Sequence, residues 1–232
     1  MTSTHLLIGS GGEVGRKLSR KLSEKGERVY ATSHRTDRPD ERDGDGPSPV
    51  PLLWDFRTPR SGLSDLDQAL ELSVLRSLSI FSHPPFLREQ SPPFPDLFDS
   101  LASLEAFVLL LDHLAPRLKS DSTVIFFFPS LSHHKADSYL SARTWIGAFH
   151  GLFDEWSRKH REYIVMGIEI LLTPDKRTPH LSPEMIKRIS DRTSRGRLAT
   201  SEEIADFAAY IVESGNPLFH GQILKTEGGP YY

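Results

Sequence analysis

Short apolar runs alternate with helix-spaced apolar positions along almost the whole chain. The first run, residues 6–8, is followed by glycines and then by Val14, Leu18 and Leu22 at a spacing of four. A short apolar run is typical of a buried strand, and apolar residues every three to four positions are typical of one helix face. The pattern therefore predicts a strand, a tight turn and a helix at the start of the chain.

The same alternation continues to the other end of the sequence. It predicts further strands over residues 26–35, 52–56, 75–83, 123–128, 164–173 and 222–226, and helices over residues 63–72, 96–118, 139–160, 182–190 and 201–212. Residues 36–51 and 83–95 are rich in proline or in Asp, Gly and Pro, and are predicted loops because proline disrupts helices and sheet ladders. Strands that alternate with helices predict an α/β fold, a single Rossmann-like doubly wound parallel sheet with helices on both faces.

Composition narrows the functional classes. The chain has 232 residues, of which 38% are hydrophobic and 25% charged, so we expect one globular domain over residues 1–232. A net charge of -3 argues against an electrostatic grip on nucleic acid. No apolar run reaches the roughly 20 residues that cross a bilayer, so we expect no membrane partner and a cytoplasmic location. The absence of cysteine excludes disulfides, thiolate metal sites and thiol catalysis.

The glycines between the first strand and helix predict a phosphate-binding turn. In a dinucleotide fingerprint, glycines bend the chain, let backbone N–H groups approach a pyrophosphate and pack the helix on the strand. The anion lies at the helix N-terminus, where unpaired amides and the dipole favour it. We predict cofactor contacts from Gly9, Ser10, Gly12, Glu13, Val14 and Gly15, with an ordinary strand-to-helix turn as the alternative. Glu13 suits this site only if its carboxylate points outward.

The end of the second strand carries Ser33, His34 and Arg35. An acidic residue there holds a ribose 2′-hydroxyl, whereas a small polar residue with a nearby arginine accepts a 2′-phosphate. The sequence therefore favours NADP(H) over NAD(H), the alternative being a solvated strand end with an unrelated arginine. Asp55 and Phe56, after the third apolar run, are further candidates for cofactor contact, although Asp55 also suits a helix cap.

Four segments together resemble the short-chain dehydrogenase/reductase family over nearly the entire chain. Besides the glycine turn, residues 196–205 and 221–229 are similar to that family's "GR…EEIA" helix and "GQ…GG" terminal strand. Residues 173–178 resemble its "PG…T" segment, which implies cofactor contacts from Pro174 and Thr178, although Asp175 stands at the glycine position. The resemblance also implies a homodimer or homotetramer, built from the two long helices and the C-terminal strand.

The resemblance implies a catalytic set that this chain keeps only in part. The family uses a tyrosine, a lysine four residues later, a serine after the preceding strand and often an asparagine in the long helix. Here Tyr139 matches the tyrosine, Arg143 stands at the lysine position, Ser130 and Ser132 are both candidate serines, and Ser103 stands at the asparagine position. The family's "NNAG" segment is replaced by residues 82–85, of which Ser82 and His83 are the implied cofactor contacts.

These differences affect the expected chemistry. A free tyrosine has a pKa near 10, so a nearby cation is needed to favour its phenolate at neutral pH. Arg143 can supply that field but cannot lose a proton, so a proton relay through it is blocked. The leading hypothesis is an NADP(H)-dependent oxidoreductase acting on a small-molecule carbonyl or alcohol substrate. The alternatives are a non-redox relative, either a cofactor-binding regulator or a cyclase or isomerase, and a purely structural partner in a hetero-oligomer.

Overall fold

The structure, a computed structural model, describes residues 2–33, 48–54, 59–71, 73–81, 97–130, 140–171, 173 and 182–226. The elements, in chain order, are β1 (Thr4–Ile8), α1 (Glu13–Glu24), β2 (Arg28–Ser33), β3 (Val50–Leu53), α2 (Pro59–Leu70), β4 (Leu75–Phe81), α3 (Leu97–Leu114), η2 (Ala115–Arg117), β5 (Leu118–Pro129), α4 (Leu140–Lys159), β6 (Ile164–Ile170), α5 (Pro183–Ser190), α6 (Ser201–Ser214), η3 (Pro217–Phe219) and β7 (Ile223–Lys225).

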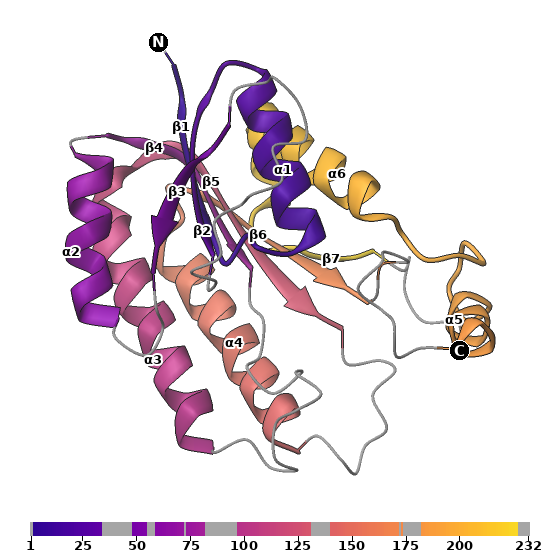
Figure 1. Ribbon diagram of the computed structural model, residues 1–232. Coiled ribbons are helices and arrows are strands. Elements are labelled where there is room, and N and C mark those ends of the chain that lie inside the picture. The colour runs from indigo at the N-terminus through magenta and orange to yellow at the C-terminus, as the bar shows by residue number, and fades with distance from the viewer. Residues whose placement is uncertain are drawn as a thin grey trace.

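In the described part of the chain the strands form one seven-stranded sheet in the order β3-β2-β1-β4-β5-β6-β7 (Figure 1). Every neighbouring pair is parallel. The chain runs outward from β1 to β3 and then returns to place β4 on the other side of β1. Ligands of such sheets bind outside the carboxyl ends of the strands at this reversal. The predicted fold class is confirmed.

Different helices cover the two faces of the sheet. Helices α1 and α6 lie on one face, and α2, α3 and α4 on the other (Figure 1). The core under α3 and α4 is aromatic, and its fully buried rings are Phe107, Phe126, Phe128, Phe149 and Phe153. The helix predicted over residues 139–160 therefore packs an aromatic face into the core. No helix in the described ranges combines the length and the apolar character needed to cross a membrane.

Residues 196–205, which resemble the family's "GR…EEIA" segment, contain the N-terminal cap and first turn of α6. Thr200 caps the helix: its Oγ1 accepts the Glu203 N–H at 3.1 Å, and Glu203 Oε2 accepts the Thr200 N–H at 2.9 Å. Arg197 donates to both carboxylate oxygens of Glu203, at 2.8 and 2.5 Å. These bonds hold the pKa of Glu203 well below its usual range. The residues of this segment thus build a helix start rather than a ligand site.

Most strands differ from their predicted bounds by a few residues, and for β3 and β5 the structure shows why. The third was predicted over residues 52–56, but β3 spans Val50–Leu53 and includes Pro51, which an edge strand tolerates because one side of it needs no ladder bond. Trp54 leaves the strand and packs edge-on against Phe107 at 6.3 Å. The fifth was predicted from residue 123, and the helix before it was predicted to reach residue 118. Instead α3 ends at Leu114, and β5 begins at Leu118, which pairs with Leu75 before the register shifts.

Candidate functional site

The predicted glycine turn joins β1 to α1 at the point where the strand order reverses. Gly9 follows the last residue of β1 and has a φ of +74°. Gly12 is the N-cap of α1, and the first helical bond runs from the Arg16 N–H to the Gly12 carbonyl at 3.0 Å. The strand, the turn and the helix therefore lie where the sequence predicted them.

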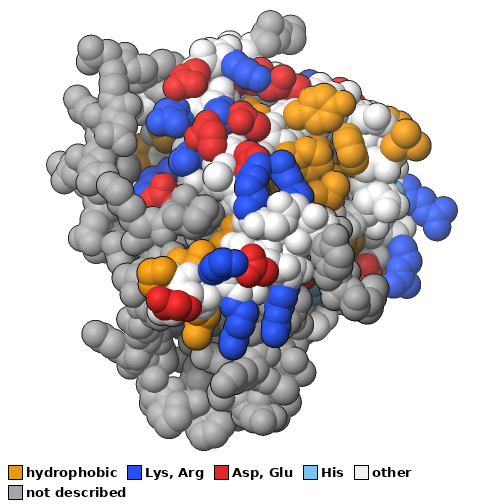
Figure 2. Space-filling view, turned by 90° about the vertical axis from the view of Figure 1, so that its right-hand side faces the viewer, with side chains coloured by type: hydrophobic (Ala, Val, Ile, Leu, Met, Phe, Trp, Pro, Cys, Tyr) orange, Lys and Arg blue, Asp and Glu red, His pale blue; other side chains and the backbone are white. Residues whose placement is uncertain are grey.

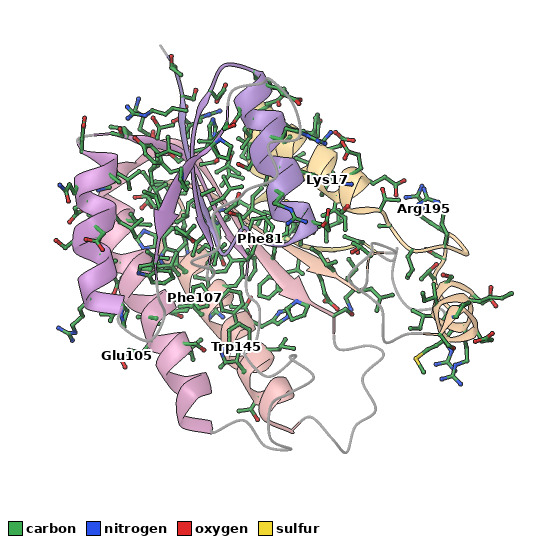
Figure 3. The ribbon with its side chains drawn as sticks, in the orientation of Figure 1. Lys17, Phe81, Glu105, Phe107, Trp145 and Arg195 are labelled. Atoms are coloured by element: carbon green, nitrogen blue, oxygen red, sulfur yellow. The ribbon has the colours of Figure 1, made fainter. Side chains whose placement is uncertain are left out.

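Two of these glycines are required by close packing. A Cβ on Gly9 would lie 2.7 Å from the carbonyl oxygen of Phe81, the last residue of β4, whose place is labelled in Figure 3. A Cβ on Gly15 would lie 2.5 Å from the carbonyl oxygen of Ser10. Gly12 differs, because a Cβ there would meet no atom within 4 Å in the part of the chain that the structure describes. Gly9 and Gly15 thus serve packing, and Gly12 leaves open space at the helix start.

The turn is bonded to the end of β2 through Thr32. The Gly9 N–H donates to Thr32 Oγ1 at 2.9 Å, and the Ser10 N–H donates to the Thr32 carbonyl at 2.9 Å. The buried hydroxyl of Ser10 donates to the same carbonyl at 3.1 Å. The hydroxyl of Ser10 therefore holds the turn in place.

The first turn of α1 fits an anion. Helices leave their first amides without intrahelical partners, and no side chain caps α1 at Gly12. The carboxylate of Glu13 accepts from the guanidinium of Arg16 on the outer side of α1, so the negative charge of this turn is paired. Val14 is buried in the core beneath the helix. Open space, uncapped amides and the positive end of the helix dipole together fit the pyrophosphate of a dinucleotide.

Two predicted catalytic positions lie at the same edge of the sheet. Ser130 directly follows β5, is buried, and donates its N–H to the carbonyl of Ile170 at 2.8 Å at the end of β6. The backbone of Arg143 lies in the first turn of α4. Helices that connect parallel strands begin at the carboxyl edge of the sheet. The structure thus brings Ser130 and the start of α4 to the edge that carries the glycine turn.

Ser103 has a partner that the sequence did not reveal. The indole Nε1–H of Trp145 donates to Ser103 Oγ at 2.8 Å, and both side chains are buried between α3 and α4. Trp145 also stacks on Phe149, with ring centroids 5.1 Å apart, and lies beside Phe107 (Figure 3). The hydroxyl at the position where the family has asparagine therefore joins α3 to α4.

Most other predicted contacts lie outside the described residues. These are His34, Arg35, Asp55, Phe56, Ser82, His83, Ser132, Tyr139, Pro174 and Thr178. The backbone of Ser33 ends β2, next to β1. The roles assigned to all these residues stay predictions.

A second polar cluster, which the sequence analysis missed, lies at the amino edge of the sheet. His5 in β1 is 1% exposed, and its Nδ1 lies 2.7 Å from Ser77 Oγ in β4, while Nε2 bonds the carboxylate of Glu27. Because a carboxylate only accepts, Nε2 carries the proton and Nδ1 accepts from the serine hydroxyl. Burial lowers the pKa of His5. The only signal in the sequence was a histidine and a serine inside apolar strands.

Ion pairs cover the outer surface of α1 and α6. Lys21 Nζ lies 2.6 Å from Asp206 Oδ1 and also pairs with Glu202, whose other oxygen is 3.4 Å from Lys17 Nζ. These partners raise the pKa of Lys21. Figure 2 shows acidic and basic side chains interleaved over this area, with apolar side chains gathered beside them. Within the described ranges, no group of three or more His, Asp or Glu side chains is placed to hold a metal ion.

Known proteins resemble this chain in structure. No family model matches it, and no curated protein sequence matches it. A short-chain dehydrogenase/reductase from Serratia marcescens BCRC 10948 superposes with a TM-score of 0.80 at 16% identity, covering 98% of each chain. Hydroxysteroid dehydrogenase from Escherichia coli gives 0.75 at 18% identity, covering 98% of this chain and 96% of that one. A short-chain dehydrogenase/reductase from Brucella melitensis, titled glucose/ribitol dehydrogenase, gives 0.76 at 19% identity, with coverages of 99% and 97%.

These similarities concern the fold. Sequence identities this low establish a common architecture and nothing finer, but the architecture matches over almost the full length of each chain. The resemblance to the short-chain dehydrogenases/reductases that the sequence indicated is therefore confirmed at the level of the fold.

Proposed function

We propose that this chain, which has the short-chain dehydrogenase/reductase fold, is a divergent oxidoreductase that uses NADP(H) to reduce a small carbonyl or oxidise an alcohol. The observation that carries the proposal is the glycine turn at the strand reversal. There, α1 begins with an uncapped first turn and open space at Gly12. Dinucleotide-binding sheets present their phosphate site at this place.

Two neighbouring segments, the turn after β1 and the end of β2, bind different parts of the dinucleotide. The amides at the start of α1 bind the pyrophosphate, and residues 33–35 bind the adenosine ribose, with Arg35 on the 2′-phosphate. The proposal is supported by the sheet order, since β2 lies next to β1 and the two strands end at the same edge. A guanidinium matches a phosphate through paired N–H bonds, which favours NADP(H) over NAD(H).

The reaction needs a proton donor and a hydrogen bond at the substrate oxygen. When bound, the cofactor supplies hydride transfer. Tyr139 gives its hydroxyl proton to the carbonyl oxygen during reduction, and Ser130 or Ser132 donates a hydrogen bond to the same oxygen. Arg143 favours the tyrosine phenolate by its charge without relaying a proton. The position of Ser130 and of the start of α4 at one edge supports these roles.

A non-redox function is the second candidate. Arg143 cannot act as a proton relay, and the hydroxyl of Ser103 already accepts the Trp145 indole N–H at 2.8 Å. The hydroxyl at the position where the family has asparagine is thus engaged with Trp145 of α4. This observation favours a protein that binds the dinucleotide without turning it over, such as a regulator, or a cyclase or isomerase.

Self-association is a further part of the proposal. β7 ends the sheet in the described part of the chain, and its Leu224 is 39% exposed. An edge strand offers unpaired backbone groups and commonly needs a cover. We expect a homodimer or homotetramer of a one-domain cytoplasmic protein, which a mass measurement on the purified chain checks for its oligomeric part.

The test has two stages. Calorimetric titration of the purified chain with NADPH and NADH is expected to give tighter binding of NADPH, with the difference lost in Arg35→Ala. Oxidation of NADPH is then followed with a panel of ketones, quinones and pterins, and Tyr139→Phe is the matched inactive variant. Binding without turnover supports the non-redox candidate, and the absence of binding contradicts both.

A further inference from the structure

Thr32, which no motif in the sequence singles out, makes contacts that hold the glycine turn in position. It lies in β2, one residue before the end of the strand, and is 2% exposed. Its side chain and its carbonyl both serve the glycine turn. Thr32 Oγ1 accepts the Gly9 N–H at 2.9 Å, and its carbonyl accepts the N–H and the hydroxyl of Ser10 at 2.9 and 3.1 Å.

The turn is held from both neighbouring strands. On the β4 side, the carbonyl of Phe81 leaves no room for a side chain at Gly9, since a Cβ would lie 2.7 Å away. On the β2 side, Thr32 bonds the turn directly. Gly9 has left the extended conformation of β1, with a φ of +74°, so its N–H is satisfied by a side chain rather than by a strand. The hydroxyl of Thr32 thus accepts the Gly9 N–H in place of a backbone carbonyl of a neighbouring strand.

These bonds decide which amides are left for a ligand. The N–H groups of Gly9 and Ser10 are used within the chain, whereas those of the first turn of α1 precede its first helical bond, from Arg16 to Gly12. The next residue after Thr32 is Ser33, where the ribose-binding segment begins. One buried side chain therefore joins the phosphate turn to the ribose end.

We propose that Thr32 is a positioning residue that sets the distance between the pyrophosphate turn and the adenosine-ribose end of the site. This inference rests on the proposed binding of a dinucleotide. Thr32 acts through Gly9 and Ser10, because it is buried beneath the turn. A nucleotide that spans both ends depends on this distance, and a fragment that occupies only the ribose end does not.

Three variants separate this role from general stability. Thr32→Val keeps the shape of the side chain and removes Oγ1, whereas Thr32→Ser keeps the hydroxyl and is expected to rescue binding. Thr123→Val is the matched control, since Thr123 is buried in β5 of the same sheet and its hydroxyl has no hydrogen-bond partner among the described residues. All three are checked by thermal unfolding before titration.

The readout is the dissociation constant for two ligands, NADP+ and adenosine 2′-monophosphate, measured by calorimetry. The second ligand has no 5′-phosphate and so reaches only the ribose end of the site. Displacement of the turn on loss of its hydrogen bond to Thr32 is expected to weaken the binding of NADP+ to Thr32→Val about tenfold. Binding of the monophosphate to the same variant is expected to change by less than about twofold, as is binding of both ligands to Thr32→Ser and Thr123→Val.

Each other outcome is decisive. Equal losses for both ligands in Thr32→Val, or no loss for either, overturn the positioning role while leaving the proposed function in place. No binding of either ligand to the unaltered chain contradicts the proposed function itself. If Thr32→Val does not fold, Ser10→Ala removes the hydroxyl bond to the Thr32 carbonyl and is expected to show the same selective loss for NADP+; its absence overturns the inference.

Discussion

The two ends of β1 carry polar groups for opposite purposes. At the amino end, His5 is bonded to Ser77 and Glu27, and the imidazole is buried with both nitrogens engaged. At the carboxyl end, the turn through Gly9 is bonded to Thr32, but the helix that follows begins without a side-chain cap. One end completes its hydrogen bonds within the chain, and the other leaves donors at an open surface.

The hydrogen bonds at the amino end stabilise the fold, whereas the uncapped amides at the carboxyl end are proposed to serve ligand binding. A buried donor or acceptor that loses its partner costs about 1–3 kcal/mol, so the amino end tolerates little change. Donors at an open helix start are solvated without a ligand and cost little. The amino end should therefore respond to mutation in stability alone, and the carboxyl end in ligand binding.

The largest effect is expected where the turn meets β4. Gly9→Ala places a Cβ 2.7 Å from the carbonyl of Phe81 and forces alanine into a positive φ, so unfolding free energy should fall by about 2–4 kcal/mol. Chemical denaturation measures the loss. Gly26→Ala is the control: it has the same sign of φ, +76°, but open space around its Cβ, and is expected to lose about half as much or less. Equal losses would show that the contact with β4 is unimportant.

A pair of serines in β4 tests the amino end. Ser77→Ala leaves Nδ1 of His5 without its donor and should lower the unfolding free energy by about 1–2 kcal/mol. Ser79→Ala removes a buried hydroxyl that has no hydrogen-bond partner among the described residues, so stability should be unchanged or slightly higher. Neither variant is expected to alter NADP+ affinity. A loss of affinity in Ser77→Ala would show that the amino end of β1 also affects ligand binding, which would contradict the division between the two ends.

Gly12→Ala tests the carboxyl end of β1, where we expect a loss of ligand affinity with little change in stability. The N-cap backbone of Gly12, with φ -80° and ψ 169°, suits alanine, and a Cβ there meets no atom of the described residues within 4 Å. Unfolding free energy should change by less than about 1 kcal/mol. The added methyl occupies the space of the phosphate, so NADP+ affinity should fall about tenfold, as calorimetry would measure. Unchanged affinity would place the phosphate elsewhere.

The smallest effect is expected from pH. Burial lowers the pKa of His5 in the folded chain below its value of 6.5 in the unfolded chain. At a pH between the folded and unfolded pKa values, the unfolded chain therefore binds a proton that the folded chain does not. Stability should therefore fall as the pH is lowered from about 6.5 through the folded pKa. Denaturation curves at pH 7.5 and 5.5 check this, and the fall should be smaller in His5→Phe. An equal fall in that variant would assign the pH dependence to other groups.

The sequence predicted the fold well because its signals are local and repeated. Apolar runs and helix-spaced positions located every strand and α-helix of the described residues to within a few residues. Their ends were predicted less well, most of all where strand pairing overrides the local pattern. Pro51 reads as loop but lies in an edge strand, and the exposed Lys119 lies in β5 because Leu118 pairs with Leu75.

The site was less predictable, because it depends on contacts between distant residues. The glycine spacing indicated the turn, but nothing local shows that Thr32 would bond Gly9, or that Trp145 would bond Ser103. The cluster of His5, Glu27 and Ser77 joins residues far apart in the chain, whose partners are chosen by the sheet order.

Backbone amide NMR during titration with NADP+ observes both ends of β1 in one experiment. We expect chemical-shift changes concentrated at Gly12, Glu13 and Val14, with the amides of His5 and Ser77 unchanged. No shift at the start of α1, or shifts confined to the amino end, would contradict this prediction.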